Sequence, residues 1–457
     1  MTTNYTVTLQ WRNNTGAAIR LFKAAETNGG TNYLFNQSEG LSQVDFASYP
    51  CYGYVSPIQT ISLSQAFAST AVPTPSDYFI FCGTAYGSDE LVLQITNQYG
   101  GVVGEASVFL NLKDIKQMYE RWVLGNDYDY TQPIPNIAVP ATNDLPSGTG
   151  SFQYSYDPSV DSKTPYILHV HGSNMELWEK DRYAETMYKR LYWQGYQGRF
   201  GSFRWPTSWG NTALYVATHP YAFDQIEFVS WLSAVGLSNT LANLNTLYPG
   251  QVELTAHSMG NIAAGEALRQ AKETLVNVYA AFEGSGAAHC YDPNTPRVSL
   301  GIADVGEPDV YSHYWTATNA QYFADAIGAA TYVDYYNTND FVLNFWLDDQ
   351  LVKPQTLLGY GYNYSLSEYY VDSSLLGFPA DTYRIFAFCQ QADCNCIGEQ
   401  GNIGGQFTSL GIPQQVNLRL APYNFGNQHK YHSGQFRSDN MSRAVFWNQL
   451  LIQMNLK

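Results

Sequence analysis

The stretch from residue 252 to residue 268 constrains the fold more than any other part of the chain. It begins as an apolar strand run, turns sharply at Ser258, and then has apolar residues at helical spacing over residues 262–268. A turn this tight forces the backbone at its centre into a strained conformation, so the flanking positions must be small. Ala256 and Gly260 meet that requirement. The pattern predicts a strand–turn–helix corner with Ser258 at the edge of a sheet.

A serine at such a corner is suited to act as a nucleophile. Its hydroxyl is a weak nucleophile at neutral pH, so it needs an adjacent base that is itself oriented by an acid. The remainder of the chain offers an acid and then a histidine, in that order. The alternative interpretation is a buried strand–helix junction with an incidental serine. The strand before Ser258 and the helix after it favour the catalytic interpretation.

The preferred acid is Asp340. It follows the strand predicted at residues 331–336, where a carboxylate reaches the same edge of the sheet as Ser258. An ordinary turn aspartate is the alternative, because Asn-Asp turns are common. Glu283, which follows the strand predicted at residues 276–282, is the second candidate for the acid.

The base is expected between the predicted last strand, at residues 383–388, and the predicted last helix, at residues 442–454. Two histidines lie in this interval. His432 is preferred, because the serine and glycine that follow it leave room for its side chain and because it is nearer to the final helix. His429 is the alternative. His257 is expected to be a packing residue of the corner, since a neighbour on such a turn points away from the nucleophile.

The segment Ala256-His257-Ser258-Met259-Gly260 resembles the nucleophile elbow of small Bacillus-type lipases, and the wider pattern resembles the α/β-hydrolase superfamily over about residues 163–457. The usual first glycine of the elbow is an alanine here, a variant that occurs in these lipases. The same lipases carry a His-Gly pair after the first strand of the domain, here His171-Gly172. The resemblance implies that the backbone N–H groups of Ser173 and Met259 stabilise the oxyanion of the reaction.

The N-terminal part of the chain has a different pattern. Residues 5–11 alternate between faces with the period of a strand, and a hairpin turn is indicated at residues 97–101. We expect an antiparallel, immunoglobulin-like β domain over residues 1–125, ending in a helix at 113–124. Residues 126–162 are rich in Pro, Gly, Ser and Asp without periodicity, which indicates a linker or a surface-wrapping arm.

The catalytic domain is expected over residues 163–457. Apolar strands alternate there with helical patterns, two of them at residues 223–232 and 237–247, which predicts a mainly parallel sheet. With the resemblance, the expected fold class is α/β: an α/β-hydrolase fold with a mainly parallel sheet, preceded by the smaller antiparallel β domain.

An insertion interrupts the sheet pattern at residues 287–330 and is a candidate lid over the site. Aromatic residues after strand ends are candidates for the walls of an apolar substrate pocket. Plain core packing is the alternative for each of them. The candidate pocket residues are Trp178, Trp205, Trp209 and Trp315.

The charge of the chain limits its partners. The sequence has 23 basic and 39 acidic residues, a net charge of −16, which argues against binding to nucleic acid or to an anionic membrane. Neither a signal peptide nor a transmembrane run is apparent. The six cysteines are an even number in a Lys-poor chain, which favours a secreted or cell-surface protein and leaves a cytoplasmic one open. A disulfide is expected among Cys389, Cys394 and Cys396.

The sequence therefore predicts a serine carboxylic ester hydrolase, a lipase or esterase, that acts on a small-molecule or polymeric ester through an acyl-serine. The predicted triad is Ser258, Asp340 and His432, with no metal and no organic cofactor. Polyester depolymerisation and acyl transfer on the same triad are alternatives. An alternative of another class is a non-catalytic binding protein on a hydrolase fold. The acyl chain length and the oligomeric state are not readable from the sequence.

Overall fold

A computed structural model describes the residues in the following ranges: 5–23, 53–57, 59–63, 79–127, 137, 141–143, 163–207, 221–271, 273–285, 330–337, 340, 342–343, 360–363, 368–372, 382–386, 414–423, 432–436 and 443–457. The chain divides into two compact units, Met1–Met118 and Tyr119–Lys457.

The first unit is built from two antiparallel sheets around one core. One sheet has the strand order β4-β1-β6-β7 and the other β3-β2-β5. Their bounds are β1 Tyr5–Trp11, β2 Ala18–Lys23, β3 Gly53–Val55, β4 Ile61–Ser62, β5 Phe79–Ala85, β6 Gly87–Asn97 and β7 Val102–Leu112. Leu9 and Trp11 from β1 share the core with Ile19 and Leu21 from β2. An antiparallel β unit therefore precedes the α/β unit, and its immunoglobulin-like topology stays a prediction.

The second unit is centred on an eight-stranded sheet of order β18-β14-β13-β12-β10-β11-β8-β9, in which every pair is parallel except β8 with β9. The bounds are β8 Glu120–Val123, β9 Thr142–Asn143, β10 Tyr166–Val170, β11 Arg199–Arg204, β12 Val252–His257, β13 Val278–Phe282, β14 Thr331–Tyr336 and β18 Gln414–Asn417. Every residue of β10, β11, β12 and β13 is buried, as expected for parallel strands covered on both faces.

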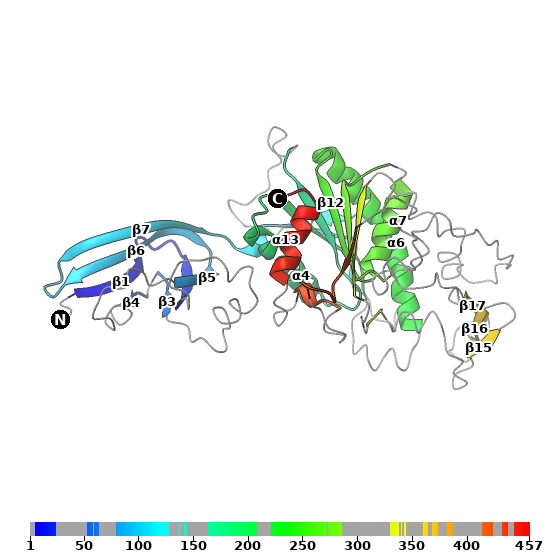
Figure 1. Ribbon diagram of the computed structural model, residues 1–457, viewed down its shortest axis with the longest axis horizontal. Coiled ribbons are helices and arrows are strands. Elements are labelled where there is room, and N and C mark those ends of the chain that lie inside the picture. The colour runs from blue at the N-terminus through cyan, green and yellow to red at the C-terminus, as the bar shows by residue number, and fades with distance from the viewer. Residues whose placement is uncertain are drawn as a thin grey trace. The chain divides into compact units, whose positions relative to one another are not determined.

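Helices cover both faces of this sheet (Figure 1). On one face lie α6 (Tyr221–Leu247) and α7 (Gly260–Ala271), whose apolar side chains join Leu168, Leu254 and Tyr279 of the strands in one core. On the other face lie α4 (Leu177–Trp193) and α13 (Arg443–Gln453). The sheet with its two helical layers is consistent with an α/β-hydrolase fold. Because the strands are parallel, the residues that follow β10, β12, β13, β14 and β18 all emerge at the same edge.

The structure corrects the expected helix at residues 113–124. That stretch contains a single 3₁₀ turn, η2 at Ile115–Gln117, and then β8, which joins the large sheet. Glu120–Val123 is too short for its apolar residues to distinguish a strand from a helix, and pairing with β11 decides it. The second unit thus begins at Tyr119, ahead of the expected residue 163, and β9 from the expected linker also pairs in its sheet.

Two further expectations differ from the structure. The two helices expected at residues 223–232 and 237–247 form one helix, α6. The strand expected to be the last of the parallel sheet is β17, Thr382–Phe386, which instead belongs to a separate antiparallel sheet with β15 (Tyr360–Asn363) and β16 (Glu368–Asp372). Among the described residues, the last parallel strand is β18, whose sequence Gln-Gln-Val-Asn carries almost no apolar signal.

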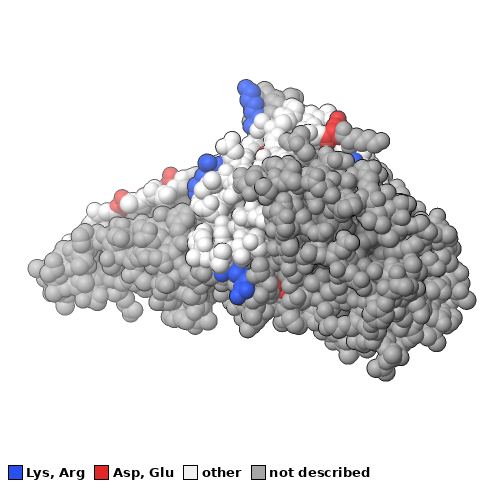
Figure 2. All heavy atoms as spheres, turned by 45° about the vertical axis from the view of Figure 1, so that its right-hand side comes forward, with Lys and Arg blue, Asp and Glu red and all other residues white. Residues whose placement is uncertain are grey.

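The candidate lid at residues 287–330 lies outside the described residues except for residue 330, and so do Cys389, Cys394 and Cys396. Cys82 is a free cysteine. No helix among the described residues is long and apolar enough to cross a membrane. On the face drawn in Figure 2, the described basic and acidic side chains are scattered among uncharged ones.

Glu253, at the start of β12, makes the stability of this sheet depend on pH. Its buried carboxylate accepts hydrogen bonds from the backbone N–H of Val278 (2.7 Å) and from Nδ2 of Asn277 (3.1 Å), and burial raises its pKa from 4.5 to about 7. The folded state therefore keeps this proton at pH values where the unfolded chain has lost it. The stability contributed by this proton is lost as the pH rises from the pKa of Glu253 in the unfolded chain to its higher pKa in the folded state. The loss is complete above the folded-state pKa.

We predict that Glu253→Gln flattens this dependence. Between about pH 5 and about pH 8, the free energy of unfolding of the wild-type protein should fall by up to about 3 kcal/mol more than that of the variant, because the glutamine cannot ionise. Urea unfolding of both proteins at the two pH values gives the change in unfolding free energy of each. Subtracting the change in the variant from that in the wild type removes the contribution of the other buried carboxyls, which both proteins share. An equal change in both proteins would contradict the assignment.

Candidate active site

Ser258 lies on the strained corner that the sequence predicts. It has φ 52°, a left-handed conformation that residues other than glycine rarely adopt, directly between the end of β12 and the start of α7. Its N–H donates to the carbonyl of Phe282 (2.9 Å), and its carbonyl accepts from the N–H of Ser285 (3.0 Å). These bonds to the neighbouring strand end hold the corner in place against its strain.

The corner is packed too closely against β10 to admit larger residues. A Cβ added at Gly260 would lie 2.4 Å from the carbonyl oxygen of His171, and one added at Gly172 would lie 2.9 Å from Cβ of Ser258. Both distances are shorter than those that real Cβ atoms make, and relieving them would require the backbone of the corner or of the neighbouring loop to shift. The two glycines therefore allow the loop after β10 to lie directly against Ser258.

The structure brings Asp340 and His432 together. Nδ1 of His432 lies 2.6 Å from Oδ2 of Asp340, and both side chains are buried. A carboxylate can only accept, so Nδ1 carries the proton, and Nε2 of the neutral ring is then the basic nitrogen. Nε2 is buried and has no hydrogen-bond partner among the described residues. The pair presents an oriented imidazole with a free lone pair.

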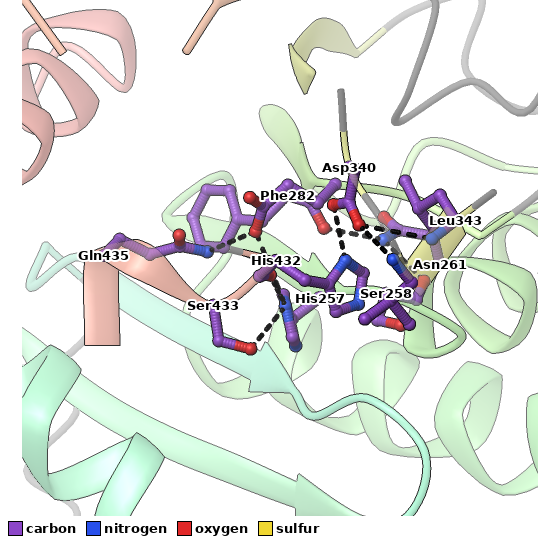
Figure 3. A network of polar contacts seen from close by, with 11 residues as sticks. His257, Ser258, Asn261, Phe282, Asp340, Leu343, His432, Ser433 and Gln435 are labelled. Carbon is purple, nitrogen blue, oxygen red and sulfur yellow. Dashed lines mark hydrogen bonds and ion pairs between the residues drawn. The ribbon is translucent and has the colours of Figure 1, made fainter. Parts of the chain in front are cut away.

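The loop after β14 holds the carboxylate of Asp340. Its Oδ1 accepts from the N–H groups of Val342 (2.9 Å) and Leu343 (3.2 Å), and its own N–H donates to the carbonyl of Asn337. Oδ2 is left to receive His432. In the view of Figure 3, Asp340, His432 and Ser258 follow one another in that order. The structure contains no hydrogen bond between Ser258 and His432 among the described residues, and the roles of acid, base and nucleophile stay a prediction.

The predicted oxyanion donors lie on the corner of Ser258 and on the loop next to it. Met259 follows Ser258 on the corner, and Ser173 follows Gly172 on the adjacent loop. Within the described part of the chain, the backbone N–H groups of Ser173 and Met259 make no hydrogen bond. Two free donors next to a serine are what a developing negative charge requires, and their role in catalysis stays a prediction.

Glu283, the second candidate for the acid, does not contact the imidazole of His432 by a hydrogen bond. It follows β13 with φ 45°, is fully buried, and accepts a hydrogen bond from Nε2 of Gln435 (3.2 Å). Burial raises the pKa of Glu283 well above its usual value, and the nearby charge of Asp340 raises it further. A protonated carboxyl at this position is less suited than Asp340 to orient a histidine.

His257, expected to be a packing residue, makes a specific polar contact that sequence reasoning missed. Its Nε2 lies 2.7 Å from the backbone carbonyl oxygen of His432 and 3.6 Å from Oε2 of Glu283. No periodicity or motif signals a bond between positions 175 residues apart. Gln435 was missed for the same reason.

His257, Glu283 and His432 are also the one group of metal-ligand type in the described ranges, with ligand atoms within 4.8 Å of one another. Two ligands of a tetrahedral zinc ion at about 2.1 Å lie only about 3.4 Å apart. Because the Nε2 proton of His257 is already donated to a carbonyl, the group is arranged for hydrogen bonding and not for coordination.

The aromatic candidates for the pocket do not behave alike. Trp178, near the start of α4, is 51% exposed and carries the guanidinium of Arg182 over its ring. Trp205 is fully buried and stacks on His171 with ring centroids 5.5 Å apart, so its assignment to an open pocket wall is corrected to that of a packing residue under the loop after β10. Trp209, Trp315 and the alternative base His429 lie outside the described residues.

The buried ion pair between Lys180 and Asp127 connects several loops at this edge of the sheet. Nζ of Lys180, on α4, bonds to the carboxylate of Asp127 and to the carbonyl of Trp205 (3.2 Å). The same carboxylate accepts from the N–H of Thr207, whose hydroxyl donates to the carbonyl of Met175. The loops after β8, β10 and β11 are thereby tied to one helix.

The comparisons with known proteins give only distant similarities. No protein-family profile matches the chain, and no curated protein matches it. A puromycin-hydrolysing peptidase of Mycobacterium tuberculosis has 12% identity and a TM-score of 0.26, over 56% of this chain and 37% of that one. One of two prolyl endopeptidases analysed for inter-domain dynamics has 11% identity and a TM-score of 0.24, over 64% of this chain and 41% of that one. The chain thus spans about two fifths of their lengths, and similarities this low say nothing about its activity.

The Lys180–Asp127 pair makes a testable prediction about stability. Burial lowers the pKa of Lys180, and Asp127 offsets that effect. Asp127→Leu should destabilise the second unit by about 3–5 kcal/mol, because it leaves a buried ammonium unpaired, whereas Lys180→Met/Asp127→Leu should recover most of the loss. Urea unfolding of the wild type, both single variants and the double variant gives the coupling. Losses that simply add in the double variant would contradict the pairing.

Proposed function

We propose that this protein is a serine carboxylic ester hydrolase that acts through an acyl-serine intermediate. The observation that carries the proposal is the buried hydrogen bond from Nδ1 of His432 to Asp340, which leaves Nε2 basic and without a partner among the described residues near a strained Ser258. A serine hydrolase needs these three features together. The Ala-His-Ser-Met-Gly sequence, which resembles that of small lipases, favours ester over amide substrates.

In the acylation step, Oγ of Ser258 attacks the ester carbonyl carbon as Nε2 of His432 takes the hydroxyl proton. The carbonyl oxygen becomes an oxyanion, and the N–H groups of Ser173 and Met259 are the proposed donors to it. Asp340 stabilises the imidazolium that forms without itself taking the proton. Collapse of the tetrahedral intermediate breaks the C–O bond, and the alkoxide leaves with the proton from Nε2.

Deacylation repeats the sequence with water. Nε2 of His432 takes a proton from a water molecule, the hydroxide attacks the acyl carbon, and the bond to Oγ of Ser258 breaks as Oγ regains the proton. The products are a carboxylic acid and the restored serine. An alcohol in place of water would make the enzyme an acyltransferase, and an ester within a polymer would make it a depolymerase, with no change to these residues.

The first experiment separates ester hydrolysis from its alternatives. The wild-type protein should hydrolyse short p-nitrophenyl esters and should hydrolyse the matched p-nitroanilides far more slowly, because an amine leaving group depends more on protonation than a phenolate does. Anilide hydrolysis as fast as ester hydrolysis would favour a peptidase. No turnover of either series, together with no labelling by a fluorophosphonate, would favour a binding protein.

The second experiment tests the three residues. Ser258→Ala and His432→Ala should each lower kcat by about 10³-fold or more with the fold intact, and Asp340→Asn should cost somewhat less. The double variant Ser258→Ala/His432→Ala should be hardly worse than either single one, because the residues act as a unit. Steady-state kinetics with a p-nitrophenyl ester measure each loss, and circular dichroism checks the fold.

His429→Ala is the matched control and should have a mild effect. The assignment fails if Ser258→Ala keeps turnover close to the wild-type value. If His429→Ala is inactive and His432→Ala is active, the hydrolase proposal survives but the base is His429.

A further inference from the structure

His257 immediately precedes Ser258, yet its side chain contacts the loop that carries the proposed base. Its Nε2 lies 2.7 Å from the carbonyl oxygen of His432. A carbonyl oxygen only accepts hydrogen bonds, so Nε2 of His257 carries the proton and donates it. The residue before the nucleophile therefore holds the main chain of the residue that activates it.

The surroundings of this bond make it strong. His257 is 3% exposed, and its ring centroid lies 6.2 Å from that of Tyr183 and 5.5 Å from that of Phe436, on one side of this aromatic pair. Water does not compete for a donor in such a place, and a carbonyl left without it would remain buried and unsatisfied. Oε2 of Glu283 at 3.6 Å and Oγ of Ser433 at 3.5 Å also lie near Nε2, and both are farther away than the carbonyl.

Contacts beyond His432 steady the remainder of its loop. The short 3₁₀ turn η8 (Gly434–Phe436) follows at once, and Gln435 within it bonds to Glu283 through its side chain and to Arg190 through its carbonyl. Phe436 packs against Tyr183 with ring centroids 4.5 Å apart. These contacts hold the residues after His432. Among the described residues, only the bond from His257 acts on the peptide group of His432 itself.

We propose that His257 is a positioning residue for catalysis: its Nε2–H group fixes the peptide plane of His432, and so sets where the imidazole of the base lies relative to Ser258. The inference rests on the proposed hydrolase function. Because His257 and Ser258 are adjacent on one corner, a single side chain links the nucleophile to the base. Asp340 fixes the orientation of the imidazole ring, and His257 fixes the position of the backbone to which that ring is attached.

Two variants at this position separate the donor from the ring. His257→Gln keeps an N–H donor at about the same reach from the backbone but loses the aromatic ring, whereas His257→Phe keeps the ring packing but loses the donor. If His257 positions the base, His257→Phe should lower kcat by about 10- to 100-fold with little change in KM, because a small misplacement of a catalytic group lowers the rate and not the binding. His257→Gln should recover most of that loss.

The readouts are ester hydrolysis and the rate at which a fluorophosphonate labels Ser258, and thermal melting reports any change in fold. His169→Phe is the matched control: His169 is another fully buried histidine against Phe436, but its Nδ1 bonds to Thr255 and not to the base. It should change the labelling rate little. Both rates should fall together in His257→Phe.

The inference is overturned if His257→Phe equals the wild type, or if His257→Gln is slower than His257→Phe, since packing would then be the role of the ring. It is also overturned if His257→Phe loses rate only in proportion to a loss of folded protein. A wild-type protein that neither hydrolyses esters nor reacts with the fluorophosphonate would instead refute the proposed function, and with it the basis of the inference.

Discussion

The hydrogen bond between His432 and Asp340 is the interaction on which the rest of the site depends. It joins two loops 92 residues apart in sequence and selects the tautomer in which Nε2 is the basic nitrogen. Neither residue lies in a helix or strand, so the positions of both depend on the strands of the sheet that precede their loops. β14 and β18 are adjacent and parallel, and their carboxyl ends emerge at the same edge as the corner after β12. The parallel order of the strands therefore brings Asp340, His432 and Ser258 to the same edge of the sheet.

The buried polar groups around this pair are kept neutral or paired. Burial lowers the pKa of His169 to about 3 and that of His171 well below its usual value, so both are uncharged packing partners. Burial raises the pKa of Glu283 and of Asp334 well above the ordinary range for carboxyls. The carboxylate of Asp340 accepts hydrogen bonds from two backbone N–H groups and an imidazole N–H. Both carboxylate oxygens of Asp334, by contrast, have no hydrogen-bond partner among the described residues.

Long buried elements were predictable and short polar ones were not. The strand at residues 331–336 was expected with the bounds that β14 has, because five of its six residues are Thr, Tyr or Val, types that are enriched in strands. β18 could not be found, since four residues with a single apolar side chain carry no periodic signal, and its partner β14 supplies the pairing that makes it a strand. β8 was mistaken for a helix for the same reason. Tertiary contacts decide the state of such segments.

The sequence by itself determined the corner at Ser258, because only small residues at positions 256 and 260 permit that turn, and it determined the order of the proposed nucleophile, acid and base along the chain. Only the tertiary structure decided that Nδ1 of His432 faces Asp340 while Glu283 bonds elsewhere, since both carboxyls follow strands of the same sheet. The tertiary structure also decided that the side chain of His257 bonds to the main chain of His432. A hydrogen bond across 175 residues depends on how two loops pack, and no local pattern in a sequence encodes that distance.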